Sequence, residues 1–179
     1  MAVVDDEKWL ERRYYGGDLP AEAERALHAV GLCWDDEKAS EAHILRALEL
    51  APDHLAVHYG AYKFYYYRHR LPEAVPHLEA WVREAIKRNG FPSNWHEVTS
   101  EHADFNNFDG DPRLFLFALR GYGWILTRLG RIEEGRTALM KVLELDKFDR
   151  MRASQLLAIL DNVDDDDEDG PSPPLAFDK

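Results

Sequence analysis

Two groups of histidine and acidic residues have the side chains that a metal site requires. His54 and His58 lie four residues apart, a spacing that would present both imidazoles on one helical face, but no HExxH glutamate or third ligand accompanies them. The second group lies in an irregular segment and consists of His96, Glu97, Glu101, His102 and Asp104. We interpret both groups as surface or packed side chains and expect no metal ion.

Nucleophilic catalysis would need a thiol or hydroxyl beside a base. The single cysteine, Cys33, has His28 five residues before it, off its face of the expected helix. The sequence contains no nucleophile elbow, phosphate-binding loop or dinucleotide fingerprint. We therefore expect a buried structural thiol, no enzymatic activity and no cofactor.

A strip of tyrosines offers binding chemistry instead. Residues 58–70, HYGAYKFYYYRHR, contain five of the eight tyrosines of the chain together with Lys63, Arg68 and Arg70. Aromatic rings bury a large area at low entropic cost, and guanidinium groups pair with carboxylates. This strip indicates a surface for a partner, although tyrosines at helical spacing also serve as core residues.

The distribution of charge excludes several classes of function. The net charge of the 179 residues is −12; residues 161–179 hold eight acids and one lysine, a charge of −7, which leaves −5 for residues 1–160. Such a body lacks the basic face that nucleic acids require. A lone cysteine, no export signal and no apolar run of about 18 residues predict a cytoplasmic protein outside the membrane.

Helical periodicity dominates and predicts an all-α fold. We expect an N-terminal helical extension over 1–19, a helical domain over 20–162 with an insertion at about 88–114, and a disordered acidic tail over 163–179. Proline, aspartate and glycine residues mark the borders of the expected helices. These helices span about 20–33, 35–50, 53–69, 72–89, 112–129, 131–146 and 149–162.

Residues 119–149 resemble a tetratricopeptide repeat (TPR) that starts at Leu116. The matching positions are Leu119, Tyr122, Gly123, Leu126, Leu129, Gly130, Gly135, Leu139 and Val142. Two further repeats of this type would start at Ala21 and Leu55. The resemblance implies about three helical hairpins in an array, an insertion, and a C-terminal capping helix.

In TPR proteins the first helix of each repeat lines a concave groove that binds ligands. Transferred residue by residue, the resemblance predicts a groove of aromatic and basic side chains. Its partner-binding residues would be Tyr59, Lys63, Tyr66, Tyr67, Arg120, Trp124 and Arg128, with Phe117 and Thr127 beside them. The asparagines of the subset that grips chaperone tails are absent, so the resemblance does not imply that ligand.

These features predict a protein–protein interaction adaptor or assembly accessory. Its partner would be a peptide or protein surface, and an acidic one would suit the basic groove. One alternative is a homo-oligomeric structural protein, for example a homodimer that packs through the Trp9–Leu10 helix or the last helix. A second alternative follows from a similarity to small bacterial repeat proteins encoded near nitrogen-fixation or other metalloenzyme genes, which implies an accessory role in metalloenzyme assembly.

Overall fold

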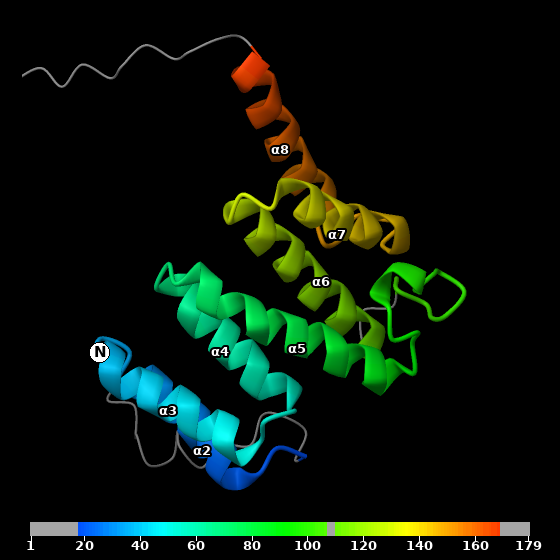
Figure 1. Cartoon of the computed structure of the whole chain (residues 1–179). Coiled ribbons are helices and arrows are strands. Elements are labelled where there is room, and N and C mark those ends of the chain that lie inside the picture. Colours follow the sequence, from blue (N-terminus) through cyan, green and yellow to red (C-terminus); the bar gives the residue numbers. More distant parts are fainter. Residues whose placement is uncertain (1–17, 107–109, 169–179) are drawn as a thin grey trace, which may run out of the picture.

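The described part of the chain is built from helices, as the sequence predicts, and contains no strand. The computed structural model describes residues 18–106 and 110–168, with side chains to residue 162, so the helix expected within 1–19 lies almost wholly outside the described residues. The elements in order are α2 (Ala21–Leu32), α3 (Glu37–Leu50), α4 (Leu55–Tyr67), α5 (Leu71–Asn89), a short 3₁₀ helix η1 (Trp95–Glu97), α6 (Asp111–Arg128), α7 (Ile132–Leu145) and α8 (Ala153–Glu168) (Figure 1). None of these helices is long and apolar enough to cross a membrane.

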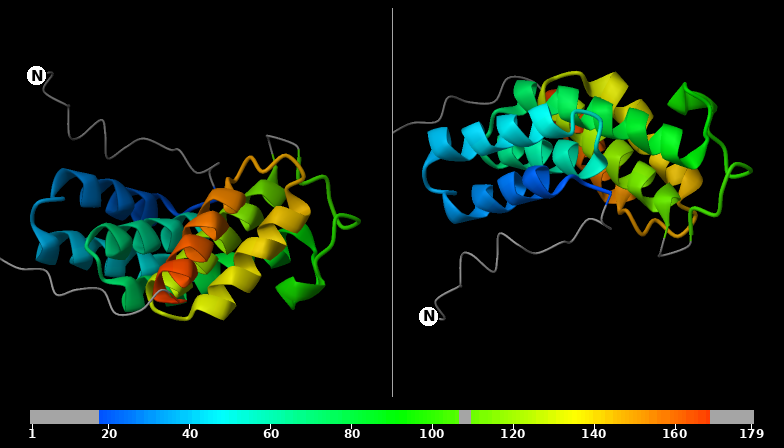
Figure 2. Two further views of the ribbon diagram at one scale, coloured as in Figure 1. Left: turned by 90° about the horizontal axis from the view of Figure 1, so that it is seen from above. Right: turned by 90° about the horizontal axis from the view of Figure 1, so that it is seen from below.

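Consecutive helices pair into hairpins that stack side by side. The pairs are α2–α3, α4–α5 and α6–α7, while α5 packs extensively on α6 and thereby joins the second hairpin to the third. Helix α8 packs on α7 at one end of the row, and the α2–α3 hairpin forms the other end (Figure 2). The expected array of helical hairpins with a C-terminal capping helix is therefore confirmed.

Local sequence signals set the helix borders. The Asp36 carboxylate accepts a hydrogen bond from the Ala39 N–H at 3.0 Å and caps α3. Pro72 and Pro112 occupy the first turns of α5 and α6, where a missing N–H costs nothing. Gly90 ends α5 with a φ of 66°, a left-handed conformation that suits glycine.

The connection between α5 and α6 is anchored to the array. Phe91, Val98 and Phe105 are buried, and the rings of Phe91 and Phe115 lie 5.5 Å apart. The Lys141 ammonium of α7 donates a hydrogen bond to the Val98 carbonyl at 3.3 Å. The insertion expected at about 88–114 is thus held by its own apolar residues against α6 and α7.

The last helix differs from its expected range of about 149–162. Asp149 and Arg152 have φ values of 47° and 54°, so the turn before Ala153 is not helical. At its other end α8 continues to Glu168, past the buried Leu160 that anchors it, because extending a formed helix needs no new nucleation. The boundary expected at 163 for the acidic tail therefore lies inside α8, and residues 169–179 lie outside the described residues.

A histidine pair joins the two helices of the second hairpin. The His58 Nδ1 and His77 Nδ1 atoms lie 3.4 Å apart, and His58 Nε2 lies 2.7 Å from the Pro52 carbonyl oxygen, to which it can donate. The His77 ring also stacks on Tyr65, with ring centroids 5.4 Å apart. Burial lowers the pKa of His58 and lowers that of His77 to about 4, so both rings are neutral at pH 7.

The close contact between α6 and α7 requires glycine. A Cβ atom on Gly135 would lie 2.5 Å from the Gly123 carbonyl oxygen and would collide with the Thr127 methyl group. Gly135→Ala should therefore lower the free energy of unfolding by about 3 kcal/mol, measured by urea denaturation. Gly31→Ala is the control, because no atom lies within 4 Å of its added Cβ. This exposed helical change should raise stability by about 0.5–1 kcal/mol, and equal effects of the two substitutions would contradict the packing.

The histidine pair predicts that acid destabilises the fold. His77 has an ordinary pKa of 6.5 when the chain is unfolded and about 4 when it is folded. Between these values the unfolded chain binds more protons, so stability should fall as the pH is lowered from 6.5. Urea denaturation at a series of pH values should show a steeper loss above pH 5 in the wild type than in His77→Phe. Identical slopes would refute this role of the pair.

Candidate functional site

The tyrosines of α4 divide between the core and the surface. Tyr65 points inward: its hydroxyl donates to Glu41 on α3 at 3.2 Å, and burial raises its pKa. Tyr59 and Tyr67 point outward and are 37% and 57% exposed. The strip of tyrosines therefore contributes rings both to the core and to the surface.

The rings of Tyr59, Tyr62, Tyr66 and Tyr67 contact one another in series and form what we call the aromatic face, which packs on the buried Trp81 of α5. The ring centroids of Tyr59 and Trp81 lie 5.0 Å apart, and those of Tyr62 and Tyr66 lie 5.7 Å apart. The Lys63 ammonium lies 5.2 Å and 5.6 Å from the ring centroids of Tyr59 and Tyr67, within cation–π range. The structure thus brings together all four site residues predicted on α4, which are Tyr59, Lys63, Tyr66 and Tyr67.

Helix α6 reaches this face because Gly121 lacks a side chain. A Cβ on Gly121 would lie 3.1 Å from Leu78 Cδ2 and 3.7 Å from the Tyr62 hydroxyl. Burial raises the pKa of Tyr62 to about 12, against the opposing effect of the nearby Arg120 guanidinium. Arg120 Nε is buried without a hydrogen-bond partner. The predicted residue Arg120 therefore lies beside the tyrosines.

The other predicted residues of α6 fall in different places. Trp124 is half-buried and Arg128 is exposed, and among the described residues no ring or charge contact links either of them to the tyrosines. Phe117 is 45% exposed, as a groove position requires. The expectation for Thr127 is wrong: it is 7% exposed because its methyl group packs against Gly135.

This face contains basic groups without acidic partners. Helix α4 has no aspartate or glutamate, and in α6 the only carboxylate is Asp111 in the first turn. Within the described chain, Lys63 and Arg120 form no ion pair, and no carboxylate lies within 4.0 Å of them; the same holds for Arg128 farther along α6. A free basic face in an acidic protein is complementary to acidic groups on a partner.

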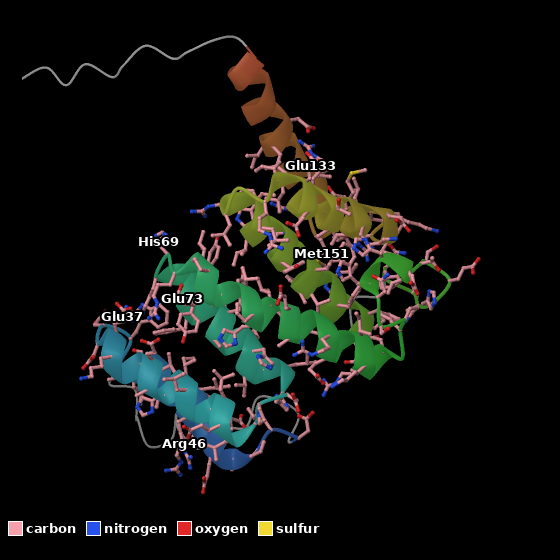
Figure 3. All side chains as sticks on the ribbon, in the orientation of Figure 1. Glu37, Arg46, His69, Glu73, Glu133 and Met151 are labelled. Atoms are coloured by element: carbon pink, nitrogen blue, oxygen red, sulfur yellow. The ribbon has the colours of Figure 1, made fainter. Side chains whose placement is uncertain are left out.

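Several basic residues elsewhere are paired with acids, although Lys38, Lys147 and Arg152 also form no ion pair among the described residues. At the end of α4, Arg70 binds Glu41 at 2.9 Å, Glu73 at 3.0 Å and Glu37 at 3.3 Å. Figure 3 shows Glu37, Glu73 and His69 gathered at that end of the molecule. The hydrogen bond from Arg70 is the main cause that lowers the pKa of Glu41. Arg70 thus stabilises the contact of α3 with the second hairpin rather than a binding surface.

A pocket of about 620 Å³ opens at the end of the aromatic face where α4 and α6 begin. Its lining is largely apolar, and its volume is within the range of sites that take a small ligand or large side chains. The lining residues are Asp18, His54, Leu55, Ala56, Tyr59, Trp81, Arg88, Leu114 and Phe117. None of them comes from the described residues between α5 and α6, whereas Arg88 and Leu114, at the two borders of the insertion expected at about 88–114, do line the pocket.

The polar rim of the pocket is an ion-pair network. Asp18 Oδ2 lies 2.8 Å from Arg88, and Asp18 Oδ1 lies 3.3 Å from His54 Nε2. Burial alone would raise the pKa of Asp18, but the hydrogen bonds with His54 and Arg88 lower it overall. His54 Nδ1 accepts the Ala56 N–H at 3.1 Å and caps α4. Because Nδ1 accepts this N–H, the proton of a neutral His54 ring lies on Nε2, which is buried and faces the Asp18 carboxylate, so neither nitrogen offers a free lone pair.

The other candidate chemical groups do not assemble into a site. His54 and His58 contact different partners, Asp18 and His77 respectively. In the segment before α6, His96 stacks on Trp95 and His102 Nδ1 accepts the Thr99 N–H at 3.1 Å. No three histidine, cysteine or acidic side chains converge on a metal position anywhere in residues 18–106 and 110–162.

Cys33 lies at the end of α2 rather than inside a helix. It is partly buried, and its thiol donates to the Ala29 carbonyl at 3.1 Å. The Ser40 hydroxyl lies 3.7 Å from the sulfur. The thiol therefore packs in the turn between the first two described helices, with no histidine among these contacts.

Sequence reasoning missed Trp81, Leu114 and Arg88 as lining residues of the pocket. The repeat was aligned from Leu116, whereas α6 begins at Asp111, so an additional turn carries Leu114 to the pocket. The Asp111–Pro112 pair did predict the start of this helix at about 112, but the groove residues were taken from the repeat that starts at Leu116, so Leu114 was left out. Trp81 and Arg88 lie on α5, the second helix of its hairpin. The resemblance to TPR proteins predicts groove residues only on the first helix of each repeat, so these two residues were not expected.

Comparison with known proteins identifies one clear relative. No protein-family model matches the chain, and no solved structure matches it. The chain is 40% identical over 126 residues to the "Uncharacterized 19.8 kDa protein in nifW 5'region" of Azotobacter chroococcum mcd 1. The match covers 69% of this chain and 71% of that protein. The chain therefore belongs to the same family as this Azotobacter protein.

Proposed function

We propose that the chain is a TPR-type adaptor of the bacterial cytoplasm that binds a partner protein through the aromatic face. The observation that carries this proposal is the combination of exposed rings with unpaired basic groups. Tyr59 and Tyr67 are exposed beside Lys63 and Arg120, on helices that lack carboxylates beyond the first turn of α6. Interfaces place aromatic and arginine side chains at their energetic centres, and this face is built from them.

The binding mode follows from the two ends of the face. At one end the pocket would take an apolar side chain of the partner between Tyr59, Trp81 and Phe117. Farther along α4 and α6, Lys63 and Arg120 would pair with acidic side chains of the same segment. Tyr62 remains a neutral hydroxyl because burial raises its pKa to about 12, so it can donate a hydrogen bond beside Arg120.

We assign no catalytic step to this site. The imidazole on the pocket rim uses both nitrogens in structural contacts, with the Ala56 N–H and Asp18. A general base needs a free lone pair within reach of its substrate. The proposal is therefore one of recognition, and it requires no cofactor.

The proposal predicts that substitutions on the aromatic face weaken partner binding. Affinity capture from the native host would identify the dominant partner, and a titration with that purified protein would give the Kd. The double variant Tyr66→Ala, Arg120→Ala should bind at least about 30-fold more weakly, because truncating a hot-spot side chain costs about 2 kcal/mol. The loss should be smaller in high salt, where the charge contribution is screened.

A matched double variant controls for the loss of one tyrosine and one arginine. Tyr122 contacts Glu79, and Arg131 binds Glu134 at 2.7 Å, both near the turn between α6 and α7. The variant Tyr122→Ala, Arg131→Ala should keep the affinity of the wild type. Circular dichroism would verify that both variants are folded. Equal binding by the two variants would refute the aromatic face as the binding site.

A second candidate function is an accessory role in assembling a nitrogen-fixation metalloenzyme. The observation that favours it is the name of the relative, which refers to the 5′ region of nifW. The same adaptor surface would then bind a component of that system. Deleting the gene of the relative in Azotobacter chroococcum should slow growth on dinitrogen but not on ammonium, and this chain should restore growth. Normal growth on dinitrogen after the deletion would count against this role.

A further inference from the structure

The pocket lies where the described chain begins. Asp18 is both the first described residue and a part of the rim, held there by Arg88 and His54. The sequence before it, MAVVDDEKWLERRYYGG, carries apolar and aromatic residues that include Trp9, Leu10 and Tyr14. Any segment attached at Asp18 is concentrated at this pocket by its covalent link.

The flank of α2 beside α4 is closed to solvent. Leu27 faces α4, since a Cβ on Gly60 would lie 2.9 Å from Leu27 Cδ2, whereas Ala23 and Ala26 pack in the cluster shared with α3 and α4. With 3.6 residues per turn, Glu24 and His28 lie on the other side of Leu27 from Ala23 and Ala26. These two polar residues are only 1% and 5% exposed. Their burial shows that this flank is covered.

We propose that residues 1–17 dock onto this flank of α2 and into the pocket, with Trp9 and Leu10 as the apolar anchors. The nine steps along the chain from Trp9 to Asp18 span about 14 Å as a helix and about 30 Å when extended. Either length is sufficient for side chains to reach a pocket whose rim includes Asp18. The lining from Tyr59, Trp81, Leu114 and Phe117 is apolar and matches an indole and a leucine side chain.

This docking gives the pocket an occupant from the same chain. A partner that uses the pocket would have to displace the segment, so the two would compete. This competition depends on the proposed function, because it requires a partner protein. The docking does not, because it involves only residues of this chain. A chain that docks its own segment and binds no partner would therefore refute the function without refuting the docking.

Proximity crosslinking in the full-length chain tests the docking. Every variant carries Cys33→Ser, to remove the native thiol, and Glu11→Cys, to label the segment without removing an anchor. A second cysteine is placed at the pocket by Phe117→Cys or, as the control, outside it by Leu45→Cys. Phe117 and Leu45 are similarly exposed, at 45% and 50%, and Leu45 lies on the outer side of the first hairpin. A short bismaleimide then joins thiols that lie close together, and mass spectrometry measures the rate.

The docked segment should crosslink within one chain at least about tenfold faster to position 117 than to position 45, because docking raises the local concentration of the thiol. The substitutions Trp9→Ala and Leu10→Ala should reduce the rate at 117 to that at 45. Equal rates at the two positions would overturn the proposal. So would a rate at position 117 that stays unchanged after Trp9→Ala and Leu10→Ala. Crosslinks that join two different chains would also overturn it and would assign the pocket to a second copy.

Discussion

The close approach of α6 to the second hairpin at Gly121 is the constraint on which the aromatic face and its pocket depend. At that residue Leu78 and the Tyr62 hydroxyl occupy the space of a side chain. The approach buries Tyr62, places Arg120 beside it and brings the first turns of α6 to the mouth of the pocket. A larger residue at this position would force α6 away from α4 and α5 and separate the two halves of the face.

The basic side chains fall into two groups: those that bind carboxylates and those that do not. Arg70, Arg88 and Arg131 all bind carboxylates, and Arg70 and Arg88 tie neighbouring elements together through them. Lys63 and Arg120, on the aromatic face, bind none among the described residues. Because surface ion pairs add little stability on average, the pairing of most basic groups says little about the energy of the fold. Lys38, Lys147 and Arg152 also form no ion pair among the described residues, so what distinguishes Lys63 and Arg120 is their position beside the tyrosine rings. The proposal of an acidic partner depends on this combination.

The sequence predicted the features that depend on local signals. The caps and prolines at Asp36, Pro72 and Pro112 placed the helices because such signals act within a few residues. The site was predicted only in part: Tyr59 and Arg120 lie on the face, but the pocket walls include Trp81 from α5, a contribution that depends on tertiary packing. The same limitation applies to the histidines. Helical periodicity predicted that His54 and His58 share one face, whereas in the fold His58 contacts His77. The roles of Trp124 and Arg128 stay predictions.

The central claim is that the aromatic face, and not another exposed surface, contacts the partner. Site-specific photocrosslinking in living cells of the native host tests this claim most directly, with a benzophenone amino acid placed at Phe117 or at Phe148. Phe148 is the control, because it is 68% exposed and lies between α7 and α8, outside the pocket. The account predicts one dominant protein adduct from position 117 and none from position 148. The same adduct from both positions, or an adduct from position 148 alone, would contradict it.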